Sequence, residues 1–211
     1  MRAAEAVNAA EAVRAAEATA DAVSTADAVR AKALDAVKAA KMEQRRLARE
    51  GRKSLDPEYR AQASSVICAH IVSSETFAAA TVVASYEWVH SEVQTTELNG
   101  AILASGKQLI VPEVLGPEAM RFVDFSKRDT EVSLHRADLV IVPAVGFDLA
   151  GRRIGNGRGY YDRALHSIPG LRVCIVFDAQ RLDQLVVEST DVLMDVVVTE
   201  SGAVVGADRW R

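Results

Sequence analysis

The chain has 211 residues, of which 49% are hydrophobic and 26% are charged, and its formal net charge is −4. This balance is typical of a soluble globular protein and gives no overall attraction to nucleic acid. No apolar run reaches the roughly 18 residues that a membrane-spanning helix needs, and the N-terminus lacks the apolar core of a signal peptide. We therefore expect a cytoplasmic protein without a membrane or nucleic-acid partner.

The first forty residues differ in composition from the rest. Residues 1–40 are rich in alanine and contain a loose Glu/Asp-Ala-Val repeat without glycine or proline, a composition that favours helix. The valines do not hold one helical stripe, so no coiled-coil seam is expected. We predict a low-complexity, helical extension over 1–40 that carries no chemistry, or else a frayed tail or partner-binding helix. A single domain over 41–211 follows it.

Two helices are expected at the start of this domain. Residues 41–55 form a basic segment, and residues 56–77 follow with Asp56 at a helix N-cap position and Pro57 at the first helical position. The basic segment could also indicate an RNA-associated protein. However, no aromatic side chains interleave its charges as stacking platforms for bases.

Apolar runs then alternate with helical segments. Strands are predicted at 80–86, 107–112, 120–125, 137–147, 171–178 and 194–200, and helices at 95–106, 160–168 and 181–186. Near-continuous valine and isoleucine runs indicate strands that are buried on both faces. The fold class is therefore α/β, a three-layer sandwich around a mostly parallel sheet, with 120–125 as an edge strand. Cys68 and Cys174, the only cysteines, lie far apart, which excludes a disulfide framework and a zinc site.

The run "GNGRGYYDR" at 155–163 comes after a buried strand and before a helix. Ligands of open α/β sheets bind beyond the carboxyl ends of the strands, where this loop is expected. Glycines allow backbone amides to approach a phosphate, Arg153 and Arg158 add positive charge, and Asp162 could hold a metal on the same phosphates. The spacing matches neither the Rossmann nor the P-loop pattern, so a glycine-rich turn with solvated arginines is the alternative.

A longer run is more specific. Residues 142–165, "VPAVGFDLAGRRIGNGRGYYDRAL", resemble the signature of the 5-formyltetrahydrofolate cyclo-ligase family, also called methenyltetrahydrofolate synthetases. Lys41 and Arg45 resemble the family's N-terminal "KxxxR", 86–98 its strand-loop-glutamate stretch, and 189–200 its C-terminal "HDxxxDxVVT" pattern. The resemblance covers roughly residues 41–200. The sequence departs from the family pattern at four positions: Trp88, Gln94, Ala144 and Thr190.

The resemblance implies an enzyme of folate and one-carbon metabolism, a ligase that forms a carbon–nitrogen ring bond. ATP and Mg²⁺ would drive cyclisation of 5-formyltetrahydrofolate to 5,10-methenyltetrahydrofolate through a phosphorylated formyl intermediate, with ADP and phosphate as products. The partner would be a reduced folate and the protein a monomer. The alternative is a non-catalytic folate- or nucleotide-binding paralogue of the family.

The resemblance also implies roles for individual residues. Arg158 and Tyr160 would be catalytic. The nucleotide would be bound by Lys41, Arg45, Arg153, Ile154, Gly155, Asn156, Gly157, Arg158, Gly159, Tyr160 and Tyr161. The folate would be bound by Glu87, Trp88, Glu92 and Tyr160, and the metal by Asp162 and Asp191.

Several of these residues have simpler interpretations. Lys41 and Arg45 could be solvated charges on one helix face, and Glu92 could cap the helix that starts near Thr95. Asp162 could be a first-turn dipole partner, and Asp191 an Asx-turn residue. Translation could begin at Met1 or at Met42, and a start at Met42 would remove Lys41.

Overall fold

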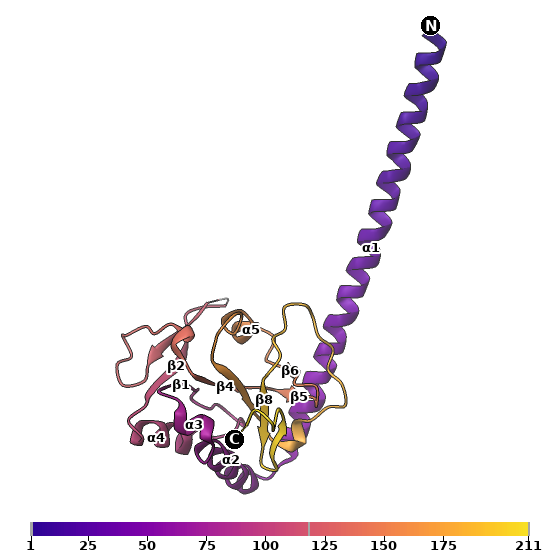
Figure 1. Cartoon of the computed structure of the whole chain (residues 1–211). Helices are drawn as coiled ribbons and strands as arrows, with labels where there is room; N and C mark the ends of the chain where they lie inside the picture. Colours follow the sequence, from indigo (N-terminus) through magenta and orange to yellow (C-terminus); the bar gives the residue numbers. More distant parts are fainter. Residues whose placement is uncertain (1, 118, 211) are drawn as a thin grey trace. The chain divides into compact units, whose positions relative to one another are not determined.

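The computed structural model describes the backbone of residues 2–117 and 119–210, and the side chains of these ranges from residue 27 onward. The chain divides into two compact units, Met1–Met42 and Glu43–Arg211. The first unit is helical and belongs to helix α1 (Arg2–Ser54), whose last turns lie in the second unit (Figure 1). No helix in the described part of the chain is long and apolar enough to cross a membrane.

The second unit is built on a seven-stranded sheet with the strand order β3-β2-β1-β4-β7-β8-β9. Its strands are β1 (Val82–Ala84), β2 (Gln108–Val114), β3 (Met120–Asp124), β4 (Leu139–Pro143), β7 (Leu171–Ile175), β8 (Val196–Thr199) and β9 (Gly202–Val205). The five central strands run parallel, whereas the edge strands β3 and β9 are antiparallel to their neighbours. The mostly parallel sheet and the edge position of 120–125 are thus confirmed. Strand β9 was not predicted.

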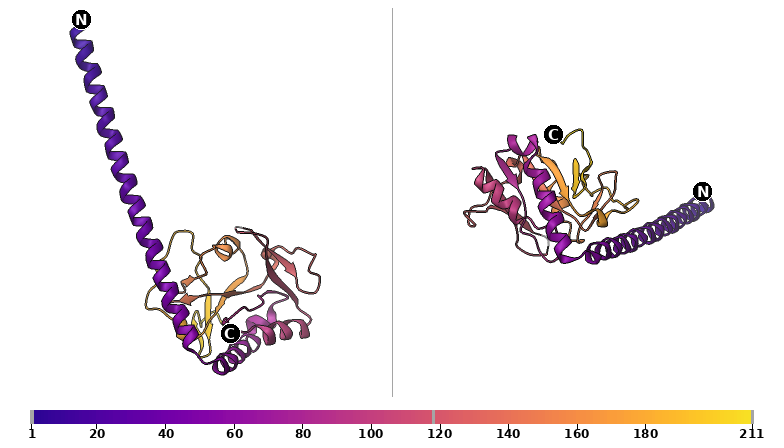
Figure 2. Two further views of the ribbon diagram at one scale, coloured as in Figure 1. Left: turned by 180° about the vertical axis from the view of Figure 1, so that it is seen from behind. Right: turned by 90° about the horizontal axis from the view of Figure 1, so that it is seen from below.

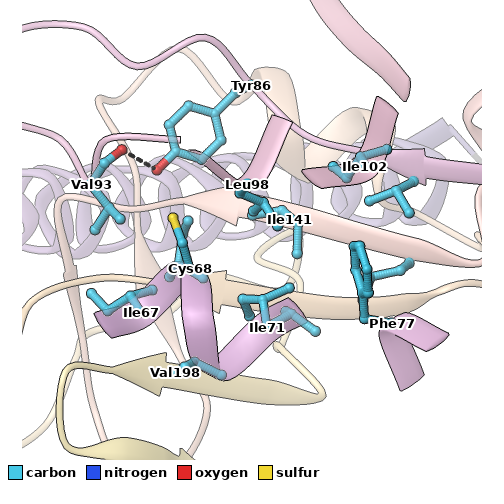
Figure 3. Close-up of a cluster of buried hydrophobic side chains, with 14 of the residues drawn as sticks. Ile67, Cys68, Ile71, Phe77, Tyr86, Val93, Leu98, Ile102, Ile141 and Val198 are labelled. Atoms are coloured by element: carbon cyan, nitrogen blue, oxygen red, sulfur yellow. Dashed lines mark hydrogen bonds between the residues drawn. The ribbon is translucent and has the colours of Figure 1, made fainter. Parts of the chain in front are cut away.

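Helices cover one face of this sheet. They are α2 (Pro57–Val72), α3 (Glu75–Ala79) and α4 (Thr96–Ala104), and both Figures 1 and 2 show them gathered on the same side. Alternate strand residues such as Ile141 and Val198 point to this side and pack against Ile67 and Ile71 of α2 (Figure 3). The Asp56 cap of α2 is present, because its carboxylate accepts a hydrogen bond from the Glu58 amide. The predicted helix over 56–77 is interrupted at Ser73 and Ser74, and the Ser74 hydroxyl caps α3.

The opposite face of the sheet is covered by less helix than the sequence suggested. The intervening strand residues, Val140 and Val142 among them, pack there against the short helix α5 (Tyr160–Ala164), the 3-10 helix η1 (Leu134–Arg136) and loops. The helix predicted over 160–168 ends at Ala164. The helix predicted over 181–186 is wrong, and the 3-10 helix η2 (Asp178–Gln180) precedes that segment instead.

The strand predicted over 137–147 is two strands. β4 ends at Pro143, and the chain then forms a separate hairpin of β5 (Gly146–Phe147) and β6 (Arg153–Ile154). The chain goes from β1 to β2 on one side and returns to β4 on the other, so the strand order reverses between β1 and β4. Ligands of such sheets bind beyond the carboxyl ends of the strands at this reversal. The segment after β1 begins at that edge, and the glycine run follows the β5–β6 hairpin that comes after β4.

Cys68 and Cys174 are both buried and form no disulfide. Among the described residues, no group of three or more His, Cys, Asp or Glu side chains could hold a metal ion.

Candidate functional site

A buried carboxylate fixes the hairpin that carries the glycine run. Asp148 is 1% exposed, and its Oδ1 atom accepts hydrogen bonds from the backbone amides of Ala150 and Arg152 at 2.9 and 3.1 Å. Its Oδ2 atom accepts one from the amide of Leu185 at 2.9 Å. Asp148 therefore joins the β5–β6 turn to the segment that leads towards Asp191.

The glycine run itself adopts a backbone that other residues rarely adopt. Gly157 and Gly159 have positive φ angles of 96° and 65°, in the region that favours glycine. A Cβ atom on Gly157 would lie 3.4 Å from Cζ of Arg45. Gly159 is the N-cap residue of α5, which is a single short turn of five residues. The loop can thus bring backbone amides close to a ligand, but α5 adds little dipole.

The last turns of α1 bring guanidinium groups to this loop. Arg45 donates from Nε to the carbonyl oxygen of Gly155 at 2.9 Å, and Arg49 donates to Oδ1 of Asn156 at 3.0 Å. Partial burial, together with the charge of Arg49, lowers the pKa of Arg45, whereas the charges of Asp191 and Glu188 raise it. Cations that are gathered and partly desolvated in this way favour an anionic ligand.

The predicted metal ligands lie on neighbouring segments. Oδ1 of Asp162 accepts a hydrogen bond from the buried guanidinium of Arg153 at 2.7 Å and from the amide of Val192 at 3.4 Å. Oδ2 of Asp191 accepts one from the amide of Glu188 at 2.8 Å. Both aspartates thus have protein partners, and the contact of Asp162 with Val192 brings its carboxylate next to the segment that carries Asp191.

The two tyrosines of the run differ in environment. The Tyr160 hydroxyl donates to the carbonyl oxygen of Gly116 at 2.7 Å, in the turn between β2 and β3. The Tyr161 hydroxyl is buried without a hydrogen-bond partner, and burial raises its pKa. Arg158 is exposed at the tip of the loop.

The predicted folate-binding residues follow β1. Glu92 is partly buried in a tight turn, where its Oε2 atom accepts a hydrogen bond from the Val89 amide at 3.3 Å. Burial raises the pKa of Glu92, and the positive charge of Arg52 partly offsets this. Helix α4 has no side-chain cap, so Glu92 does not have the capping role considered above.

The neighbours of Glu92 are arranged differently. Both carboxylate oxygens of Glu87 accept hydrogen bonds from Arg128, each at 2.9 Å. Trp88 is 37% exposed and donates from Nε1 to the Thr96 hydroxyl at 3.1 Å. Glu87 therefore already has a partner, whereas the Trp88 ring has a free surface.

Arg49 and Arg52 were not among the site residues predicted from the sequence. Their spacing from Arg45, four and seven residues, places all three on one helix face. This periodicity was a usable signal, because only one face of the helix could meet the domain. Lys41 lies in the first unit, and its role stays a prediction.

Most of the chain is similar to proteins of one known family. A sequence profile of the 5-formyltetrahydrofolate cyclo-ligase family matches residues 37–200. The 5-formyltetrahydrofolate cyclo-ligase of Escherichia coli K12 is 27% identical over 176 residues, which cover 72% of this chain and 96% of that protein. The mitochondrial enzyme of Arabidopsis thaliana is 28% identical and covers 81% of this chain and 78% of its own length. A shorter match to the Mycolicibacterium smegmatis enzyme, at 36% identity, spans only 39% of that protein.

Solved structures of two such proteins are also similar to this chain. The 5,10-methenyltetrahydrofolate synthetase of Aquifex aeolicus superposes with a TM-score of 0.68 at 31% identity, covering 77% of this chain and 91% of that one. The Mycoplasma pneumoniae synthetase gives a TM-score of 0.69 at 21% identity, covering 76% of this chain and 98% of that one, and supports the fold.

Proposed function

The chain belongs to the 5-formyltetrahydrofolate cyclo-ligase family, and on that premise we propose how its residues carry out the ATP-dependent cyclisation of 5-formyltetrahydrofolate to 5,10-methenyltetrahydrofolate. The formyl oxygen is a poor leaving group. Transfer of the ATP γ-phosphoryl group to it would allow N10 to attack the formyl carbon, and phosphate would then leave with that oxygen. Such a transfer asks the protein mainly for positioning and neutralisation of charge.

The observation that carries this proposal is the contact between α1 and the glycine run. Arg45 donates a hydrogen bond to Gly155 and lies against Gly157, whose positive φ favours glycine. Arg49 contacts Asn156, so Arg45 and Arg49 together line one edge of the glycine run with positive charge. We assign the phosphates of ATP to this edge, with Lys41 and Arg158 as further cations and the loop amides as donors.

Magnesium fits this edge as an ion that arrives on the nucleotide. Mg²⁺ is commonly bound through one or two carboxylates together with substrate phosphates, so a complete protein cluster is not needed. Asp162 and Asp191 supply such a pair, and the contact of Asp162 with the Val192 amide keeps their segments adjacent. When bound, the ion would neutralise charge on the transferring phosphoryl group.

The folate is assigned to the neighbouring edge, beyond β1. The carboxylate of Glu92 would accept hydrogen bonds from the N–H groups of the pterin ring, and the exposed Trp88 ring would contact its face. The Glu87–Arg128 pair would line the entrance rather than bind the ring. Tyr160 is held by Gly116 where it can position substrate beside the glycine run.

The test is the absorbance of methenyltetrahydrofolate after mixing the protein with 5-formyltetrahydrofolate, ATP and Mg²⁺, with a control lacking ATP. An increase that requires ATP and releases one ADP per product supports the proposal. A flat trace from protein that binds ATP or folate in calorimetry would favour the non-catalytic paralogue. Light scattering under the same conditions tests the expected monomer.

A further inference from the structure

Arg52, in the last turn of α1, is a buried cation without a partner. Its residue is 8% exposed, and its Nε atom is buried with no hydrogen bond. Its guanidinium forms no ion pair within 4.0 Å with any residue that the structure describes. Arginine is almost never this buried unless it is paired, because its charge loses the stabilisation of water. The arrangement is therefore incomplete without an acceptor.

The opposing charge in its surroundings is Glu92. Each of these two groups shifts the pKa of the other through its charge, and Tyr86 also faces Arg52, as do the like charges of Arg49 and Arg60. Arg52 and Glu92 nevertheless do not close into a salt bridge. A carboxylate and a guanidinium that lie near each other without contact can be joined by a ligand that offers donors to one and an acceptor to the other.

Other unpartnered polar atoms lie at the same end of the sheet. The Ser85 hydroxyl, directly after β1, and the Tyr161 hydroxyl are both buried without hydrogen bonds. Tyr161 and Tyr86 both feel the charge of Glu92, which places them around the same carboxylate. Buried atoms of this kind are few in native proteins, and a group of them indicates a surface that a polar ligand completes.

We propose that Arg52 is a specificity-determining residue that donates a hydrogen bond to the C4 carbonyl oxygen of the pterin ring, while Glu92 accepts from the adjacent N–H groups. The inference deepens the proposed function and rests on it. On the pyrimidine edge of a reduced folate, the 2-amino group and N3–H are donors and the neighbouring C4 oxygen is an acceptor. A carboxylate followed by a guanidinium is complementary to this order of groups.

The chemistry of the side chain suits this role. A guanidinium has no acceptor and stays charged, so it recognises the oxygen and rejects a donor at the same place. A site that buries such a group discriminates strongly, because a ligand without the acceptor leaves the charge unpaired.

The experiment compares two ligands on four proteins. The ligands are 5-formyltetrahydrofolate and its 4-thioxo analogue, which keeps both donors and replaces the oxygen by a weaker acceptor. The proteins are the wild type, Arg52→Gln, Glu92→Gln and the control Lys53→Gln, which removes the exposed neighbouring charge. Dissociation constants are measured by calorimetry, and circular dichroism confirms that each variant is folded.

We expect the exchange of oxygen for sulfur to weaken binding to the wild type and to Lys53→Gln by about tenfold, as for loss of a charged hydrogen bond. Arg52→Gln should bind the folate about tenfold or more weakly and should no longer distinguish the ligands. The inference would be overturned if the ratio of the dissociation constants of the 4-thioxo analogue and the folate were the same in Arg52→Gln as in the wild type. Should that variant not fold, Arg52→Lys must show a reduced ratio.

Glu92→Gln separates this inference from the proposed function. It should weaken both ligands by the same factor and leave their ratio intact. If Glu92→Gln binds folate as well as the wild type does, the proposed pterin site is wrong. If it binds weakly while Arg52→Gln keeps the wild-type ratio, only the role of Arg52 fails.

Discussion

Nε of Arg45 donates a hydrogen bond to the carbonyl oxygen of Gly155 across 110 positions of sequence, at 2.9 Å. This contact joins the last turns of α1 to the glycine run, and through it a helix that precedes the sheet contributes to the proposed phosphate site. The next residue, Arg46, points elsewhere and pairs with Glu43 and Glu50 on the exposed side of the same helix.

Replacement of Arg45 by alanine should raise the KM for ATP by about tenfold or more, because it removes a charge-assisted donor at the phosphates. The KM for folate should change little. Steady-state kinetics with each substrate varied in turn measure both values. Arg46→Ala is the matched control and should leave both KM values within about twofold, since exposed ion pairs contribute little. Equal effects of the two substitutions would contradict the assignment.

Gly157→Ala should damage the phosphate site through the backbone. Its φ of 96° is unfavourable for alanine, and the new Cβ would lie in van der Waals contact with Arg45, 3.4 Å from Cζ. We expect a higher KM for ATP and a loss of about 1–2 kcal/mol in the free energy of unfolding.

Gly100→Ala is the comparison for that change. Gly100 lies inside α4, and a Cβ atom there would meet nothing within 4 Å. This substitution should stabilise the protein by about 0.5–1 kcal/mol and leave the kinetics unchanged. Urea unfolding of both variants gives the two values, and a Gly157→Ala protein with wild-type stability and KM would refute the strained-loop explanation.

Asp148→Asn should lower the free energy of unfolding by about 3 kcal/mol, because an amide nitrogen would face backbone N–H groups that now donate to a buried carboxylate. Urea unfolding provides the measurement. Asp183→Asn, at an exposed position nearby in the chain, should change stability by no more than about 0.5 kcal/mol. Similar losses in both variants would mean that Asp148 does not hold the hairpin.

The pH dependence of kcat/KM for folate should follow the ionisation of the Glu92 carboxylate. Its carboxylate must be ionised to accept pterin N–H groups, and burial raises its pKa above the ordinary 4.5. As pH falls through this raised pKa, kcat/KM for folate should fall, whereas at higher pH it should be constant. Arg52→Gln removes a charge that lowers this pKa, so the fall should begin at a higher pH. A pH profile of Glu92→Gln with the same acidic limb would assign the titration to another group.

The start of the chain can be tested by truncation. A chain that begins at Val37 keeps the whole region matched by the family profile and should retain kcat and both KM values. A chain that begins at Met42 lacks Lys41 and should show a KM for ATP that is raised by about tenfold, as for loss of a charged contact. Equal KM values in the two proteins would remove Lys41 from the site.

Local patterns in the sequence were sufficient for most of the sheet. The valine-rich runs around Val140 and Val197 indicated buried parallel strands, because only strands covered on both faces tolerate such runs. The Asp56 cap was also readable, since capping depends on residues within one turn. By contrast, β9 was not predicted. This strand has only four residues, all of them half-buried, and it is recognisable by its antiparallel pairing with β8.

The glycine run and Glu92 could likewise be proposed from the sequence, since each occupies a recognisable motif at the end of a strand. The environments of these residues, however, could not be predicted from the sequence. That Arg52 is buried opposite Glu92, and that Glu87 is occupied by Arg128, depend on segments far apart in the chain. Local sequence determines backbone conformation and which faces are apolar. Only tertiary packing decides which charges lose water and which find a partner, because desolvation and pairing are properties of the assembled neighbourhood.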